Sequence, residues 1–188
     1  DFAQLPLNNH LETELLFGIG RTYGAEFHYH KKQGRHQFEG NYTFSRAFRQ
    51  VVADDSQIAV NEGEWYPSYY DKPHTLNLNY YFQPNPRHSI AVNFTYSTGR
   101  PITAPLGSYT NANILNIPVY SARNQFRIPD YHRLDVAYTF DFARKKKERQ
   151  WQSSWTVSVY NLYARRNAYS VFFRQTPFQK VTAYQISV

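Results

Sequence analysis

Histidine and carboxylate side chains lie close together in one short part of the sequence. Glu26, His28 and His30 occupy alternate positions, so in an extended strand they point to the same side, and His36 follows across a short turn. Imidazole and carboxylate groups are metal ligands, so one interpretation is a metal site. The alternative, which we favour, is a polar strand face near the end of the strand. We therefore expect neither a bound metal nor another cofactor.

The sequence offers no recognisable catalytic groups. The chain has no Cys, which excludes disulfides, thiolate metal sites and cysteine nucleophiles. It also has no pair of carboxylates at a catalytic spacing, no G-x-S-x-G motif and no Gly-rich loop of the kind that holds a phosphate. We expect a protein that is not an enzyme.

Aromatic and amide side chains gather in two long segments, Gln50–Pro73 and Ser97–Asp130. Amides and phenols can hydrogen-bond sugars or peptide backbones, and aromatic rings offer stacking surfaces. The predicted ligand contacts are Trp65, Tyr69, Tyr109, Asn111, Asn113, Tyr120 and Asn124. The alternative is that these side chains pack one loop against another over the rest of the fold.

The elements that would position these residues are β-strands. Apolar and polar residues alternate along most of the chain, as they do from His88 to Tyr96. The predicted strands, about eight in number, are Tyr23–Tyr29, Phe38–Phe44, Leu76–Phe82, His88–Tyr96, Leu134–Phe142, Trp151–Tyr160, Tyr169–Arg174 and Phe178–Val188. Most approach the ~9–11 residues that a tilted strand needs to cross a bilayer. No helix is expected.

The composition helps to choose between two all-β classes, the soluble sandwich and the membrane barrel. The 188 residues include 17 Tyr and 14 Phe, and the mean hydropathy is −0.67. No run of about 18 apolar residues could form a membrane-spanning helix, whereas a barrel strand is apolar only at alternate positions. The polar strand faces carry Asn, Thr, Ser and Gln with little Lys, and the apolar faces carry Tyr and Phe near strand ends. Aromatic girdles of this kind favour a membrane barrel.

The lengths of the connections favour the same class. Short links, Lys31–Arg35, Gln83–Arg87 and Ala143–Gln150, alternate with the two long segments. Outer-membrane barrels have short turns on the periplasmic side and long loops outside, whereas a sandwich has no reason to sort its loops in this way. We therefore expect both long loops at one end of the sheet and all three short turns at the other.

The positive charge does not predict a nucleic-acid partner. Lys and Arg number 21 against 14 Asp and Glu, which gives a net charge of +7. Much of it is local, in the run Arg144–Arg149, which we interpret as a solvated turn. Interleaved aromatic residues or an element that fits a groove would be needed for nucleic acid, and neither is present.

Six segments, in chain order, resemble the barrel of TonB-dependent outer-membrane receptors, in particular the large Bacteroidetes group of the SusC type. They are Gly18–Glu26, Asn41–Ala47, Asn61–Pro67 with Tyr70–His74, Thr98–Pro105, Arg123–Asn124 with Arg127–Asp135, and Asn161–Asn167. Ala164 stands where Asn is common in that family, a departure that we interpret as neutral. The family's plug, TonB box, first dozen or so strands and final strand are not in this chain.

The resemblance implies an all-β fold, an antiparallel transmembrane β-barrel present as a partial barrel of about eight strands. Residues 1–188 would be the C-terminal part of the barrel, roughly strands 14 to 21 of 22. Such a piece would form an open sheet whose edges are completed by chain outside it, since an unpaired edge is not tolerated in lipid.

The function that the resemblance implies is import across the bacterial outer membrane. The cargo would be a bulky, scarce nutrient of the glycan, peptide, siderophore or cobalamin class. The implied partners are the TonB complex, reached through the missing N-terminal part, a surface lipoprotein lid, and outer-membrane lipid. The alternative is a structural or scaffold barrel subunit of a larger outer-membrane complex without active transport.

Side-chain directions follow from the two-residue period of a strand. Leu78, Val92, Phe94, Val136 and Tyr138 are expected to face lipid, and Asn77, Asn93, Asp135 and Thr139 are expected to line the interior. Arg133 and Asp135 share the interior face two residues apart. They are expected to form a structural ion pair, with contact to a plug as the functional alternative.

Overall fold

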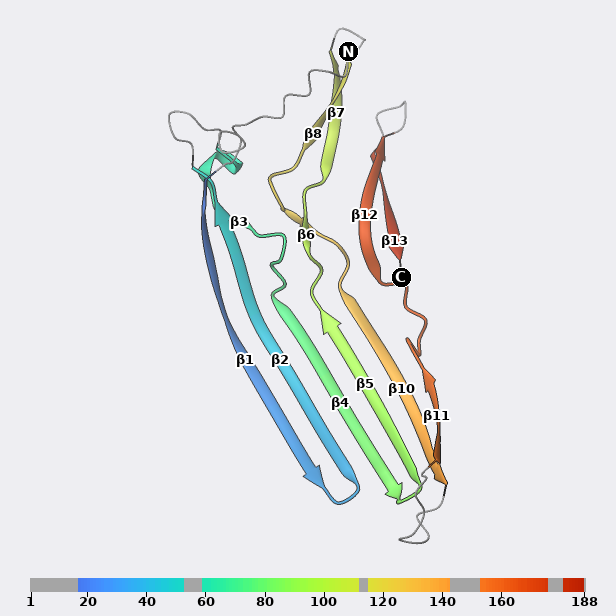
Figure 1. The fold of residues 1–188 in the computed structure, drawn as a ribbon. Coiled ribbons are helices and arrows are strands. Elements are labelled where there is room, and N and C mark those ends of the chain that lie inside the picture. The colour runs from blue at the N-terminus through green and yellow to red at the C-terminus, as the bar shows by residue number, and fades with distance from the viewer. Residues whose placement is uncertain (1–16, 53–58, 112–114, 143–152, 176–180, 188) are drawn as a thin grey trace, which may run out of the picture.

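The structure, a computed structural model, describes residues 17–52, 59–111, 115–142, 153–175 and 181–187, and these form antiparallel β-sheets. The principal sheet has the order β1-β2-β4-β5-β10-β11, with the short β3 beside β2 (Figure 1). Its strands are β1 (Ile19–Gln33), β2 (His36–Gln50), β3 (Tyr66–Pro67), β4 (His74–Asn85), β5 (His88–Ser97), β10 (Tyr131–Phe142) and β11 (Ser153–Val159). The predicted all-β, antiparallel class is confirmed.

Three two-stranded sheets lie beyond one end of the principal sheet (Figure 1). They pair β6 (Pro101–Ile102) with β9 (Phe126–Arg127), β7 (Pro105–Asn111) with β8 (Leu115–Tyr120), and β12 (Ala168–Gln175) with β13 (Val181–Ser187). A single 3₁₀ turn, η3 (Asn61–Gly63), lies in the loop after β2. Among the described residues, no helix has the length and apolar character to cross a membrane.

The principal sheet is open, and the described strands do not close into a barrel. β1 pairs only with β2 along all 15 of its residues, and its 15 side chains are exposed. β11 is the other edge, because it pairs only with β10. Within the described residues, the sheet is therefore a single layer, and no second layer packs on either of its faces.

Two of the predicted strands are not part of the principal sheet, where we expected them. The segments around Tyr169–Arg174 and Phe178–Val188 do form strands, β12 and β13, but they pair with each other and not with the principal sheet. Six strands, rather than eight, therefore follow one another across the sheet. β12 and β13 form a hairpin at the loop end.

Asparagine side chains explain why β11 stops short. Asn167 takes the place of a paired strand residue: its Oδ1 accepts from the His132 N–H at 3.1 Å, and its Nδ2 donates to the His132 carbonyl at 3.0 Å. Asn161 closes a turn on itself by accepting from Arg165 N–H and donating to its carbonyl. The His132 backbone groups of β10 are thus satisfied by a side chain, and the Leu134 carbonyl accepts from the Leu162 N–H at 2.7 Å, so no paired strand is needed there.

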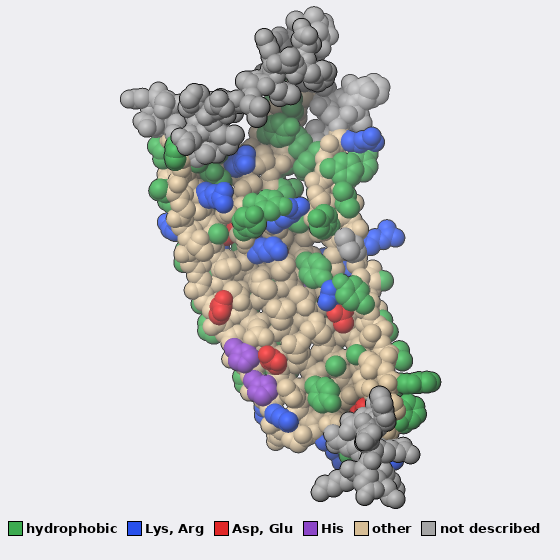
Figure 2. Space-filling view, viewed as in Figure 1, with side chains coloured by type: hydrophobic (Ala, Val, Ile, Leu, Met, Phe, Trp, Pro, Cys, Tyr) green, Lys and Arg blue, Asp and Glu red, His purple; other side chains and the backbone are tan. Residues whose placement is uncertain are grey.

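The strand register confirms the predicted division of side chains between two faces. Residues paired across antiparallel strands share a face, and Leu78 pairs with Phe94, while Val92 pairs with Val136. On the other face Asn79 pairs with Asn93, and Asn93 with Asp135. Figure 2 shows this face mostly as backbone and side chains that are neither hydrophobic nor charged, with many of the hydrophobic side chains toward the loop end.

The predicted sorting of the connections is also confirmed. The register places the turns between β1 and β2 and between β4 and β5 at one end, and Phe142 pairs with Ser153 at that same end. The segments that link β2 to β4 and β5 to β10 lie at the opposite end (Figure 1). The charged run Arg144–Arg149 falls outside the described residues.

Ala164 has a left-handed backbone. Its φ is +51°, in the tight turn where its N–H donates to the Asn161 carbonyl at 2.7 Å. Ala is strained in this region, whereas Gly has no Cβ and Asn can offset the strain with a local hydrogen bond from its side chain.

We predict that Ala164→Gly or Ala164→Asn raises the free energy of unfolding by about 0.5–1 kcal/mol, since strain is relieved. The measurement is denaturant unfolding of the intact natural protein. Ala137→Gly, in the middle of β10, is the control and should lower stability instead. Equal effects of the two glycine substitutions would contradict the strain at Ala164.

Candidate functional site

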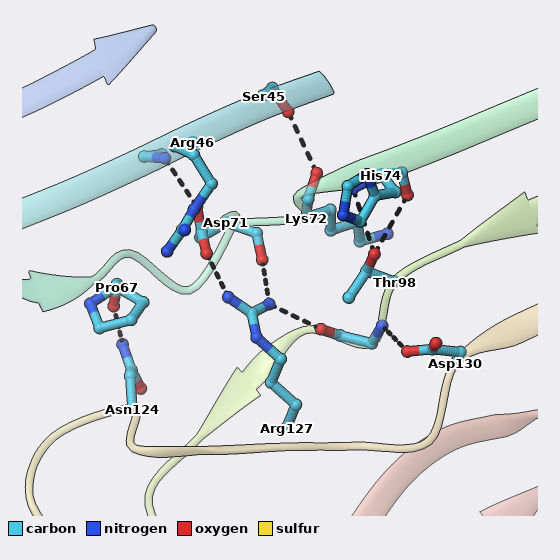
Figure 3. Close-up of polar contacts among 12 residues, drawn as sticks. Ser45, Arg46, Pro67, Asp71, Lys72, His74, Thr98, Asn124, Arg127 and Asp130 are labelled. Carbon is cyan, nitrogen blue, oxygen red and sulfur yellow. Dashed lines mark hydrogen bonds and ion pairs between the residues drawn. The ribbon is translucent and has the colours of Figure 1, made fainter. Parts of the chain in front are cut away.

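A buried carboxylate joins the loops at the end of the sheet (Figure 3). The Asp71 side chain is fully buried, and its Oδ1 accepts hydrogen bonds from the Ala47 N–H at 2.7 Å and from Arg46 Nε at 3.1 Å. Its Oδ2 pairs with Arg127. A buried carboxylate needs several donors to compensate its lost hydration, and here three groups from β2 and β9 supply them.

Arg127 carries the connection to the second long loop. One guanidinium nitrogen donates both to the Asp71 carbonyl at 2.7 Å and to the Gly99 carbonyl at 2.9 Å. At Gly99 a Cβ would lie 1.8 Å from the Ile128 carbonyl oxygen, so only glycine allows the two chain segments to approach this closely. The close approach lets one arginine bridge both loops.

Asp130 fixes the place where the second loop returns to the sheet. Its carboxylate accepts from the Gly99 N–H at 2.9 Å and from the Tyr96 hydroxyl at 2.7 Å. Partial burial raises the pKa of Asp130, but these two hydrogen bonds, with Arg127 and Arg165 nearby, outweigh burial and hold the pKa below its ordinary value.

Two asparagines fasten the outer parts of the loops to each other. Asn61 Oδ1 accepts from the Arg123 N–H at 2.7 Å. Asn124 Nδ2 donates to the Pro67 carbonyl at 2.8 Å, and Asn124 has a φ of +58°, a conformation that asparagine tolerates. The two long loops are thus one hydrogen-bonded unit.

An open cavity of about 580 Å³ lies on the polar side of the sheet, below this unit. Its lining combines two cations, three phenols, four hydroxyls and a few apolar groups: Tyr69, Lys72, Thr75, Thr95, Ser97, Thr98, Gly99, Arg100, Ile128, Pro129, Tyr131, Ala168 and Tyr169. No Asp or Glu lines it. The volume is within the ~300–1,000 Å³ of ordinary ligand pockets.

Arg100 is held in place at the edge of this cavity. Its guanidinium carbon lies 4.7 Å from the centre of the Tyr69 ring, and Nη2 donates to the Tyr169 carbonyl at 3.1 Å. Tyr69 is supported in turn by an edge-on contact with Tyr70, with 5.3 Å between ring centres. A cation over an aromatic face, with one further hydrogen bond, has little freedom left.

The predicted ligand residues have different surroundings. Tyr69 lines the cavity and is 45% exposed, and Tyr120 is exposed at the end of β8. Trp65 lies half-buried under the Arg21 guanidinium at 4.7 Å, and Asn124 holds the Pro67 carbonyl.

Three of the predicted ligand residues cannot be placed in the site. Tyr109 and Asn111 belong to β7, but their side chains are outside the described part of the structure, as is the whole of Asn113. Sequence reasoning missed Lys72, Arg100, Tyr131 and Tyr169 as cavity residues. The sequence signal for Arg100 was its position directly after Gly99 in Thr98–Pro105, one of the six segments that resemble the receptor family.

The histidines considered as a metal site do not converge. His28 Nδ1 pairs with Asn41 Oδ1 at 2.6 Å on the polar face, whereas His36 lies on the apolar face and pairs with Tyr80 at 2.7 Å. Within the described ranges no group of three or more His, Asp or Glu side chains could hold a metal ion. The predicted Arg133–Asp135 ion pair is present, with 2.9 Å between nitrogen and oxygen.

The apolar face of the sheet carries two rows of His–Tyr pairs. At the turn end, His36 pairs with Tyr80, and His88 pairs with Tyr138. At the loop end, His74 pairs with Tyr42 at 2.8 Å and His132 pairs with Tyr163 at 2.7 Å. Each row contains aromatic side chains that also carry polar atoms, which suits a boundary between an apolar medium and water.

No model of a known family matches the chain, and no curated protein and no solved structure matches it. The function is therefore inferred from the residues of this chain and their arrangement.

We predict that Asp71→Asn lowers the free energy of unfolding by about 3 kcal/mol, because it leaves two guanidinium groups without their buried partner. The measurement is denaturant unfolding of the intact natural protein, with limited proteolysis to locate the opened loops. Glu64→Gln removes an exposed carboxylate from the same loop and should change stability by less than about 0.5 kcal/mol. If the two variants unfold alike, Asp71 does not hold the loops.

Acid should loosen the second long loop through Asp130. Because its pKa in the folded protein lies below the ordinary value, charged Asp130 stabilises the fold fully above about pH 4. That contribution is lost as pH falls through the lower, folded-state pKa. Hydrogen exchange of residues 98–104, measured from pH 6 downward, should show more opening in the natural protein below about pH 4. Asp130→Asn should open at every pH and show a smaller acid-induced change.

Proposed function

We propose that the chain forms part of a transmembrane β-barrel in the bacterial outer membrane, and that the barrel imports a bulky nutrient as a TonB-dependent receptor. The observation that carries the proposal is the apolar sheet face bounded by the two His–Tyr rows. A one-layer sheet leaves this face without protein cover, and side chains such as Phe27 and Trp155 are 63% and 72% exposed. Exposed apolar surface of this extent needs an apolar partner.

The spacing of the rows fits the apolar part of a bilayer. On β4, His74 belongs to the loop-end row, and Phe82 is paired with His36 of the turn-end row. Phe82 comes eight positions after His74. Along β10, Phe140, which is paired with His88, comes eight positions after His132. Eight residues at ~3.4 Å each span about 27 Å, or about 20 Å along the normal for a strand tilted by ~40°. The expected apolar band is ~25 Å.

The position of the cavity supports import rather than a purely structural role. It lies on the polar face at the end that carries the long loops, where an outer-membrane barrel meets the outside. Polar lining continues from it towards the turn end through Asn79, Asn93 and Asp135. A ligand captured among the loops would thus meet a hydrophilic wall along its path.

The six sequence segments that resemble the receptor family support the proposed family by their positions in the structure. Asp71, Gly99, Arg127 and Asp130 come from three of those segments, and they meet in one hydrogen-bonded unit. Under this proposal the TonB complex acts through chain outside these residues, and a surface lipoprotein would cover the loop end.

The membrane orientation can be tested with one pair of variants. Val92 is four residues from both His88 and Tyr96 on β5, so it would lie near the bilayer midplane. Val92→Arg should lower stability by about 2–4 kcal/mol and reduce the amount of receptor in the outer membrane.

The neighbouring residue provides the control. Ala91 points to the opposite, polar face beside a cavity of about 360 Å³, and Ala91→Arg should be tolerated. The readouts are outer-membrane fractionation and the shift of the folded protein on unboiled gels. If Val92→Arg is fully tolerated and Ala91→Arg is not, lipid contacts the face that carries Ala91, and the proposed orientation is wrong.

A further inference from the structure

We propose that the loop-end cavity binds a carboxylate of an acidic sugar chain, and that Arg100 and Lys72 recognise that carboxylate. The proposal deepens the proposed function, on which its biological meaning rests, by naming the class of cargo. Binding itself can be measured whether or not the protein imports anything.

The charge of the cavity is not balanced by its lining. Lys72 and Arg100 line it and no carboxylate does. The three ion pairs among the described residues engage Arg46, Arg127 and Arg133, so neither cavity cation takes part in one. Figure 2 shows Lys and Arg side chains gathered over the loop half of the polar face, with few Asp or Glu among them. An anionic ligand is the natural complement to such a surface.

Arg100 is oriented in advance for a carboxylate. The Tyr69 ring holds the guanidinium plane, and the Tyr169 carbonyl uses one of its five N–H donors. The remaining donors form a fixed fork that matches the two oxygens of a carboxylate. A preorganised group loses little side-chain entropy when the ligand binds.

The rest of the lining favours a sugar over other anions. Thr75, Thr95 and Ser97 present hydroxyl groups, which both donate and accept as sugar hydroxyls do. Tyr169 is 69% exposed, so its ring is available to stack on the C–H face of a pyranose, whereas Arg100 already lies over the Tyr69 ring. A simple inorganic anion would use the cations but not the stacking surface.

The test uses the intact natural protein, extracted in detergent, and isothermal titration calorimetry. The probes are trigalacturonate, its trimethyl ester and triglutamate, which separate charge from sugar. Trigalacturonate should bind at least tenfold more tightly than either of the others. Arg100→Gln should weaken trigalacturonate binding by about 10- to 100-fold, because a charge-assisted bidentate contact is lost. Arg100→Lys should retain an intermediate affinity.

Controls separate a lost contact from a damaged fold. Arg123→Gln removes an exposed arginine from the same loop, outside the cavity lining, and should leave affinity unchanged. Lys72→Gln, at an exposed position, gives an independent variant that should also weaken binding. Limited proteolysis shows whether each variant keeps its loops folded.

Three results with the natural protein would overturn the proposal. They are equal binding of the acid and its ester, tighter binding of triglutamate, and no binding of any probe. Unchanged affinity in both Arg100→Gln and Lys72→Gln would remove the site from this cavity. Failure of import or of outer-membrane localisation, with trigalacturonate binding intact, would instead contradict the proposed function and leave the cargo class standing.

Discussion

The loop end of the structure depends on one buried carboxylate. Asp71 has no contact with solvent, and it is compensated by Arg46, Arg127 and a backbone N–H. Burying a charge costs free energy in itself. The contribution of Asp71 is specificity, because only one arrangement of the loops supplies all the hydrogen-bond donors that its carboxylate needs. Because Arg127 also binds the Gly99 carbonyl, the arrangement of the first loop determines that of the second. The position of Arg100, next to Gly99, follows from it.

The sheet is constrained differently, because it has no packed core. Of the described apolar side chains, Val51, Tyr66, Pro101, Ala104 and Ile128 are buried, and all five lie in loops or short strands at the loop end. The long strands gain their order from backbone pairing and from cross-strand contacts such as Phe27 with Tyr42, 6.2 Å between ring centres. The described part of the loops therefore holds buried apolar side chains, and the described long strands of the sheet do not. Under the proposed function, the lipid around the sheet supplies this burial.

Much of the sheet could be predicted from the sequence, because the two-residue period assigns every side chain to a face once one pairing is known. Val92 and Asn93 therefore lie on the expected faces. The hairpin β12–β13 could not be placed in this way. Its residues alternate as those of a membrane strand would. Asn167, however, takes the place of a paired strand residue beside β10. A side chain that pairs with the backbone in this way leaves no periodic signal in the sequence. The cavity also escaped prediction, since Arg100, Tyr169 and Lys72 are far apart in sequence and meet only after Asp71 has joined the loops.

The conspicuous sequence segments and the candidate ligand groups are largely different residues. Asp71, Gly99, Arg127 and Asp130 hold the loops together through a buried charge, a contact that only glycine permits, and two hydrogen-bond partners. Lys72 and Arg100 stand directly beside them, but at the cavity surface, where a different side chain would not disturb the loop architecture. A fold arranged in this way can change its ligand at such positions while the buried unit stays the same. If the proposed function holds, ligand selectivity should be sought in Lys72 and Arg100 rather than in the buried residues beside them.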